Sequence, residues 1–104
     1  ISSEVGMTLA YKIAWLQEKA GLSFAASLAS QSKLFGSDLI QECAYYGTEI
    51  MGLYGQIAES KWAPLNGALN FEYQFCKGMT IAAGSNEIQR NLIAWVGLQL
   101  PRFK

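Results

Sequence analysis

Residues 23–53 read SFAASLASQSKLFGSDLIQECAYYGTEIMGL, and they form the longest helical pattern in the chain. Large apolar residues recur in this segment at intervals that average close to the 3.5-residue period of helix bundles. These residues are Leu28, Phe35, Leu39, Tyr46, Ile50 and Leu53. Alanine, serine and glutamine fill many of the other positions, so a neighbouring helix can approach closely. We expect a helix from Ser23 to Leu53, about 45 Å long at 1.5 Å per residue, with Gly36 and Gly47 as poor helix formers inside it.

A shorter helical pattern precedes this segment. Its apolar residues recur at steps of three and four, which places them on one helical face. They are Val5, Leu9, Ile13, Leu16 and Ala20. Ser2 or Ser3 could cap the start of this helix, and Gly21 could end it.

The segment after the long helix is predicted to be a connection followed by a short helix. Residues 54–68 hold turn-forming glycine, proline and an Asn-Gly pair, and we expect Trp62 to pin this connection to the bundle. A third helix is predicted near residues 69–77, with Gly78 as its end. Residues 79–83 are small and apolar, and we expect them to be extended.

A last helix is predicted after Gly84, with Ser85 or Asn86 as its N-cap. Its apolar residues share one face, Gly97 suits its C-terminal end, and Pro101 cannot continue it. The chain shows no two-residue alternation of apolar and polar residues, which strands would require. The predicted fold class is therefore all-α, an up-down bundle of about four helices that forms part of a larger bundle domain.

Composition excludes several classes of partner. The 104 residues include eight basic and eight acidic side chains, so net charge gives no reason to propose nucleic acid or an anionic membrane surface. Charged residues make up only 15%, against roughly 25% in typical soluble domains, so we expect protein or a ligand to cover part of the surface. No apolar run approaches the ~20 residues of a membrane helix. No signal peptide is visible and the chain starts with Ile1, so we expect a piece of a longer protein.

The residues that could carry chemistry are few. The chain has no histidine and no Cys-x-x-Cys, which argues against zinc; Cys43 and Cys76 are predicted to be buried, reduced thiols. Asp38, Glu42 and Glu49 share one side of the long helix, where a solvated face is the simplest interpretation.

Residues 82–91, AAGSNEIQRN, are more informative. Gly84 would let a backbone or ligand approach closely, and Ser85 and Asn86 lie where free helix N–H groups could bind an anion. An ordinary capped helix start explains the same residues, and the pattern alone leaves both interpretations open.

The run GSNEIQRNLIA at residues 84–94 is similar to the C-terminal signature of flavin-dependent acyl-CoA dehydrogenases, in which Gly-Thr-Ser-Glu-Ile-Gln-Arg opens the last long helix. Upstream, EIMGLYG at residues 49–55 resembles the Gln-x-x-Gly-Gly-x-Gly segment of that family. AYKIAWL at residues 10–16, SKLF at 32–35 and GLQLPR at 97–102 also resemble family segments, in the expected order. The resemblance covers essentially the whole chain.

This resemblance implies two places where the chain would contact FAD. Ser85 and Glu87, next to Gly84, match the family residues that contact bound flavin. Glu49 and Gly52 match the segment that reaches the FAD of a neighbouring subunit near its pyrophosphate. Glu49 puts a carboxylate where the family has an amide, and it would repel a pyrophosphate unless it points elsewhere. Leu53 replaces the second glycine and would crowd a close approach.

The resemblance also implies that the catalytic base lies elsewhere. Many family members have Tyr-Glu before the motif glycine, and that Glu removes the α-proton of the acyl-CoA; Ala82 and Ala83 stand there instead. A methyl group accepts no proton, so the carboxylate would come from a helix before Ile1. The family's upstream helices, N-terminal domain and β-domain are also missing, so residues 1–104 alone should not be active.

The implied function is therefore that of the C-terminal part of an FAD-dependent oxidoreductase. The parent would carry out the α,β-dehydrogenation of an acyl-CoA in fatty acid metabolism, as a cytoplasmic homo- or hetero-oligomer. The alternative is a non-catalytic helical assembly module or a degenerate subunit of such a complex. Ala83, Glu49 and Leu53 favour this alternative, whereas Gly84-Ser85 and the intact Ile88-Gln89-Arg90 favour the enzyme.

Overall fold

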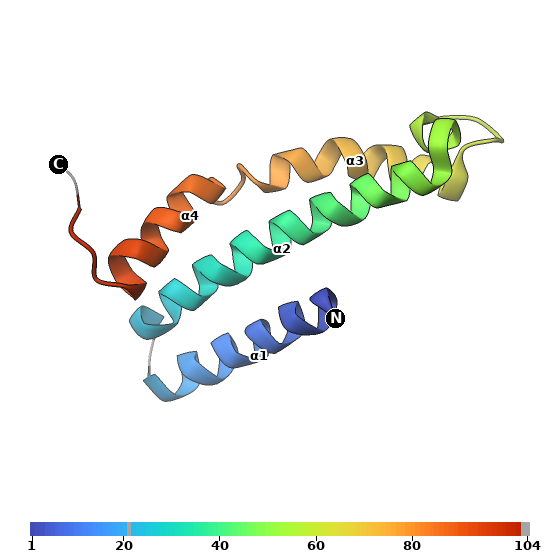
Figure 1. Ribbon diagram of the computed structural model, residues 1–104. Coiled ribbons are helices and arrows are strands. Elements are labelled where there is room, and N and C mark those ends of the chain that lie inside the picture. The colour runs from blue at the N-terminus through green and yellow to red at the C-terminus, as the bar shows by residue number, and fades with distance from the viewer. Residues whose placement is uncertain (21, 103–104) are drawn as a thin grey trace. The chain divides into compact units, whose positions relative to one another are not determined.

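The computed structural model describes residues 1–20 and 22–102, and these residues form four α-helices (Figure 1). The helices are α1 (Ser2–Ala20), α2 (Leu22–Met51), α3 (Ala68–Met79) and α4 (Asn86–Leu92). Two short 3-10 segments, Gly52–Gln56 and Pro64–Gly67, join α2 to α3, and a π-helical turn, Ile93–Gly97, continues α4. There is no strand among the described residues. The predicted all-α class is confirmed, while the predicted helix end at Gly21 falls outside the described residues.

The long helix forms nearly as predicted, since α2 runs unbroken past both internal glycines and ends two residues before Leu53. At Gly36 an added Cβ would meet nothing within 4 Å. At Gly47 it would lie 2.8 Å from Leu69 Cδ2, so the missing side chain allows α3 to pack closely. Gly47 therefore serves packing, which outweighs its poor helix propensity.

The prediction that residues 79–83 are extended was wrong. Met79 ends α3, and residues 80–83 form a turn in which Ile81 and Ala82 donate their N–H groups to the Gly78 carbonyl, at 3.1 and 2.8 Å. The last carbonyls of a helix lack partners within it, and this turn supplies them. Residues 80–83 fold back because their N–H groups can then donate to a carbonyl at the end of α3. The hydrophobicity of these residues does not indicate that the carbonyl needs a donor.

The chain divides into two compact units, Ile1–Gly36 with Gly84–Lys104, and Ser37–Ala83. In the first unit, Gly6 of α1 lies beside the Phe35 ring of α2, and Figure 1 shows α1 and the first half of α2 running antiparallel. The residues of α2 that are buried here are small, namely Ala25, Ser27 and Ser30. A Cβ at Gly97 would overlap Ser27 Oγ, so the backbone of the segment after α4 packs directly against the Ser27 side chain of α2. Figure 1 shows α1 and α4 alongside this half of α2.

The second unit is also packed through small side chains. Ser37 and Ala44 on α2 are 5% exposed, and Cys76 on α3 is fully buried. The large apolar residues near the end of α2 behave differently, since Ile50 and Leu53 are more than 80% exposed. The spacing of large residues correctly indicated a helix, but small residues form the face that packs within the chain.

Two further expectations for the second unit were wrong. Trp62 is 63% exposed and has Lys61 Nζ at 5.1 Å from its ring, so it does not pin the connection to the bundle. Cys43 is exposed, although Cys76 is buried as expected, and both thiols are free. Cys43 lines an open hollow between α2 and α3, together with Leu69 and Glu72 of α3.

The close approach at Gly97 predicts opposite effects for two glycine-to-alanine changes. Gly97→Ala should lower the free energy of unfolding by about 1–3 kcal/mol, because the new methyl group overlaps Ser27 Oγ. Gly36→Ala, inside α2 with open space around it, is the matched control and should stabilise the protein by about 0.5–1 kcal/mol. Thermal unfolding of the two variants in the full-length protein checks this, and equal shifts for both would contradict the packing described.

Candidate functional site

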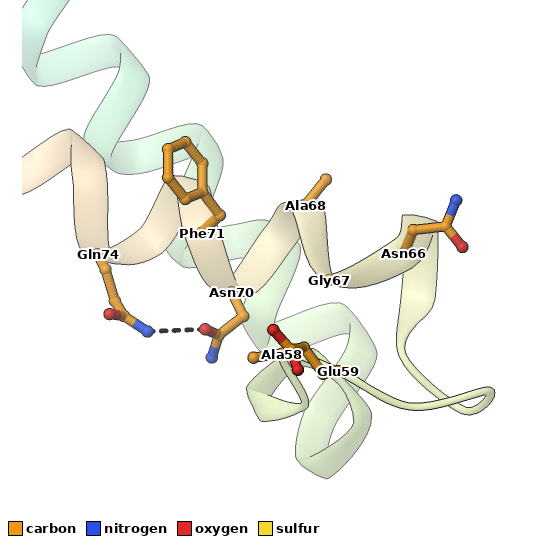
Figure 2. A pocket seen from close by; sticks show the side chains of 8 residues that line it. All are labelled: Ala58, Glu59, Asn66, Gly67, Ala68, Asn70, Phe71 and Gln74. Atoms are coloured by element: carbon orange, nitrogen blue, oxygen red, sulfur yellow. Dashed lines mark hydrogen bonds between the residues drawn. The ribbon is translucent and has the colours of Figure 1, made fainter.

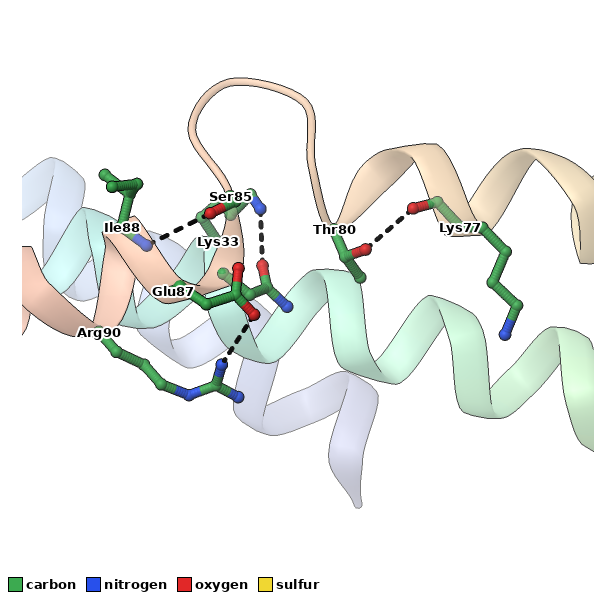
Figure 3. A network of polar contacts seen from close by, with 8 residues as sticks. Lys33, Lys77, Thr80, Ser85, Glu87, Ile88 and Arg90 are labelled. Atoms are coloured by element: carbon green, nitrogen blue, oxygen red, sulfur yellow. Dashed lines mark hydrogen bonds and ion pairs between the residues drawn. The ribbon is translucent and has the colours of Figure 1, made fainter.

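Ser85 is the N-cap of α4. Its backbone is extended, with φ −60° and ψ 160°, and its Oγ accepts a hydrogen bond from the Ile88 N–H at 3.4 Å (Figure 3). The predicted cap is therefore confirmed for Ser85, and Asn86 is instead the first helical residue. Ser85 is half-buried, so its side chain caps the helix and still reaches the protein surface.

Gly84 is required by the backbone for two reasons. Its φ is +89°, in the left-handed region where a side chain is strained. A Cβ at this position would also lie 2.9 Å from Gln89 Nε2, and this amide donates to the Gly84 carbonyl at 3.4 Å. Because Gln89 already occupies the space beside Gly84, replacing the glycine would disturb the segment whether or not a ligand binds.

Lys33 belongs to this site, although the sequence did not single it out. Its Nζ donates to Asn86 Oδ1 at 2.6 Å, across 53 residues of sequence. Asn86 is only 5% exposed, so its side chain points inward between the two neighbours Ser85 and Glu87. The resemblance of residues 32–35 to a family helix was the one sequence signal near Lys33, and it does not reveal this pairing.

Glu87 is an exposed carboxylate that the site keeps ionised. Its own backbone N–H is the largest cause of its lowered pKa, followed by the Ser85 hydroxyl, while partial loss of solvent opposes both. The charges of Arg90 and Lys33 lower the pKa further. The ion pair from Arg90 Nη1 to Glu87 Oε1 is long, at 3.9 Å, and both side chains are more than half exposed, so it contributes little by itself.

Ala83, immediately before Gly84, adopts φ +55°. This conformation costs a non-glycine residue roughly 1–2 kcal/mol. The residue is exposed and carries only a methyl group, so it offers no proton acceptor.

The other pair of predicted flavin contacts lies in the second unit, where α2 ends. Gly52 has φ +55° and open space around it, and it stops the helix in the left-handed conformation common at helix ends. Glu49 and Gly52 line an open hollow of about 750 Å³, together with Tyr45, Gln56 and Asn70 among others. Glu49 is the one charged residue lining it. The hollow therefore offers hydrogen-bonding groups but no cation.

A neighbouring hollow of about 540 Å³ forms beside the turn before α3 (Figure 2). Leu65, Asn66 and Gly67 are all left-handed, and a Cβ at Gly67 would overlap the Ala58 carbonyl oxygen. The Asn-Gly turn predicted from the sequence is thus present. Asn70, which accepts from Gln74 at 2.7 Å and donates to the Gln56 carbonyl at 2.9 Å, ties the turn to the end of α2.

The acids of α2 do not gather into a metal site. Asp38, Glu42 and Glu49 are exposed, and no group of three or more potential metal ligands occurs in residues 1–20 and 22–102. Within that same part of the chain, each helix is either too short or too polar to cross a membrane.

Comparison with known proteins identifies what this arrangement resembles. Residues 1–98 match the family model described as acyl-CoA dehydrogenase, C-terminal domain. Two Mycobacterium tuberculosis proteins are similar in sequence. Acyl-CoA dehydrogenase FadE29 is 33% identical over 88 residues, covering 85% of this chain and 23% of that protein. Acyl-CoA dehydrogenase FadE26 is 35% identical over 75 residues, covering 71% of this chain and 19% of that protein.

A solved structure gives the same result. In the crystal structure of the ChsE4-ChsE5 complex from Mycobacterium tuberculosis, one chain matches 99% of this chain with a TM-score of 0.83 and 29% identity. The match covers 26% of that chain. Residues 1–104 thus span about a quarter or less of the relatives they match.

The lowered pKa of Glu87 predicts a pH-dependent contribution to stability. A carboxyl group whose pKa is lower in the folded than in the unfolded state stabilises the fold above its unfolded-state pKa, and loses that contribution as the pH falls through its folded-state pKa. Glu87→Gln should therefore lower the melting temperature slightly at neutral pH and have no effect in strong acid. Thermal unfolding across this pH range checks it; a difference that stays constant with pH would contradict the prediction.

Proposed function

Because the chain belongs to the acyl-CoA dehydrogenase family, as its C-terminal helical domain, we propose that it helps to hold FAD in an acyl-CoA-oxidising enzyme. FAD, when bound, supplies the hydride acceptor for the α,β-dehydrogenation of an acyl-CoA thioester. The contribution of this chain is cofactor contacts and packing. The proposal depends on one observation at the start of α4. There the Ser85 hydroxyl, which caps the helix, and the ionised Glu87 carboxylate lie on either side of the buried residue Asn86.

The residues at the start of α4 fit a flavin nucleotide. The Ser85 hydroxyl can donate and accept, and the Glu87 carboxylate can accept from a ribityl or ribose hydroxyl. Both side chains reach the surface, and Gly84 with Gln89 fixes the backbone that leads into them. We propose Gly84, Ser85 and Glu87 as one part of the FAD site.

The end of α2 fits only the uncharged parts of the cofactor. Gly52 leaves space for close approach, and Gln56 and Asn70 add amides to the hollow beside it. The Glu49 carboxylate and the absence of a lining cation do not suit a pyrophosphate. We therefore propose that Glu49 and Gly52 contact hydroxyl-bearing parts of the FAD of a neighbouring subunit.

The base for the α-proton must come from another part of the parent protein, since Ala83 cannot accept a proton. A second subunit is part of the proposal, and the ChsE4-ChsE5 neighbour is itself a complex of two different proteins. Acyl-CoA thioesters are intracellular metabolites, so we place the parent enzyme in the cytoplasm.

A non-catalytic assembly role is the alternative function. It is favoured by Ala83 and Glu49, and by the exposed apolar side chains of α1, where Tyr11 is 70% and Trp15 57% exposed. Such surface normally faces another protein. This alternative would be favoured if the full-length parent protein does not bind FAD.

Substitutions of Ser85 separate a flavin contact from a simple helix cap. Ser85→Ala removes a cap worth about 1 kcal/mol of stability and, if the hydroxyl contacts FAD, a hydrogen bond of similar size, which corresponds to roughly five- to tenfold weaker FAD binding. Ser85→Thr keeps both interactions and is the control. In the full-length protein, flavin fluorescence titration measures the FAD affinity of each variant, and thermal unfolding measures its stability.

If Ser85→Ala lowers stability and leaves FAD affinity unchanged, Ser85 is only a cap. Gly84 variants are less useful here, because φ +89° and the Gln89 contact make any side chain at that position disruptive without a ligand.

A further inference from the structure

The strongest long-range polar contact of the first unit involves a lysine that none of the flavin motifs includes. Lys33 Nζ donates to Asn86 Oδ1 at 2.6 Å, a length typical of charge-assisted hydrogen bonds. Asn86 is 5% exposed, and Lys33 is itself half-buried on α2. A charged donor on a buried acceptor is among the stronger side-chain interactions in proteins.

Asn86 stands between the two proposed flavin contacts. Asn86 is buried, whereas its neighbour Ser85 is half-buried and its neighbour Glu87 is exposed. Fixing the Asn86 side chain therefore fixes the backbone from which both contacts project. Ser85 is further held by its cap with Ile88, but that bond is longer, at 3.4 Å, and joins residues within the same turn. Lys33 ties the segment to α2.

We propose that Lys33 is a positioning residue for FAD: its ammonium group holds Asn86, and thereby sets Ser85 and Glu87 in the arrangement that the cofactor requires. This inference rests on the proposed function of the α4 segment. The ammonium group acts in a second way, because its charge reaches Glu87. Among the charged groups around Glu87, Arg90 belongs to the same helix and Lys33 to α2. Both favour the ionised carboxylate that accepts from a cofactor hydroxyl.

Lys33→Met removes the donor and the charge while keeping most of the side-chain volume. FAD affinity of the full-length protein should fall about tenfold or more, as expected for loss of a charged hydrogen bond. Lys33→Arg, which keeps charge and donors, should recover affinity to within about threefold. Lys77→Met is the matched control, because Lys77 also donates to an amide oxygen, that of Gln41, but in the second unit.

Thermal unfolding beside the FAD titration distinguishes a positioning role from a loss of stability, because affinities are compared at a temperature at which each variant is folded. Lys33→Gln keeps an N–H donor without the charge, so its FAD affinity should fall less than that of Lys33→Met. Lys33→Gln also carries the test if Lys33→Met does not fold. The double variant Lys33→Met/Asn86→Ala should bind FAD within about twofold of Lys33→Met alone, since both changes remove one interaction.

The proposal is overturned if Lys33→Met weakens FAD binding no more than Lys77→Met does, or if Lys33→Arg binds FAD as weakly as Lys33→Met. Ser85→Ala distinguishes failure of the positioning role of Lys33 from failure of the flavin contact itself. If Ser85→Ala weakens FAD binding and Lys33→Met does not, the positioning role alone fails. If neither variant changes FAD affinity, the flavin contact fails, and the role of Lys33 fails with it.

Discussion

The close approach between Gly97 and Ser27 is the constraint on which the position of α4 depends. It brings the backbone of the segment after α4 against the Ser27 side chain of α2, and the small size of both residues allows this. Ser30 is buried one turn further along α2, and Lys33 follows it by three residues, a neighbouring position on the helix surface. Close packing thus places α4 near enough for a lysine to reach Asn86. A larger residue at position 97 would therefore shift α4, and with it the bond between Lys33 and Asn86.

The interactions that hold the start of α4 differ in strength. The Ser85 cap is worth about 1 kcal/mol, whereas a hydrogen bond from a charged group contributes about 1.5–3 kcal/mol. The exposed pair between Glu87 and Arg90 adds less than either. The lysine from α2 therefore outweighs the local helix signals in fixing this segment. This order explains how a helix of seven residues keeps a defined start, although so short a helix is marginal by itself.

Local signals in the sequence predicted the helices and the cap at Ser85. The extent of α2, the cap at Ser85 and the turn at Asn66-Gly67 each depend on a few neighbouring residues, which is why they were correct. The turn at residues 80–83 was not predicted, because it forms to supply hydrogen-bond donors to the Gly78 carbonyl at the end of α3. Cys43 and Trp62 were wrongly predicted to be covered, because the hydrophobicity of a side chain does not show which face of its segment packs against the rest of the protein. The pair of Lys33 and Asn86 spans 53 residues. No periodicity connects them, and only a folded structure brings them together.

The structure of the full-length protein with FAD bound tests the central claim most directly, through the distances from Ser85 Oγ and the Glu87 carboxylate to the cofactor. The account predicts that both lie within hydrogen-bond distance of FAD, about 2.5–3.2 Å between heavy atoms, with the Lys33–Asn86 bond intact beside them. If FAD binds with no atom within reach of either side chain while the Ser85 cap persists, the start of α4 is an ordinary helix start. The claim that this segment holds the cofactor would then be wrong.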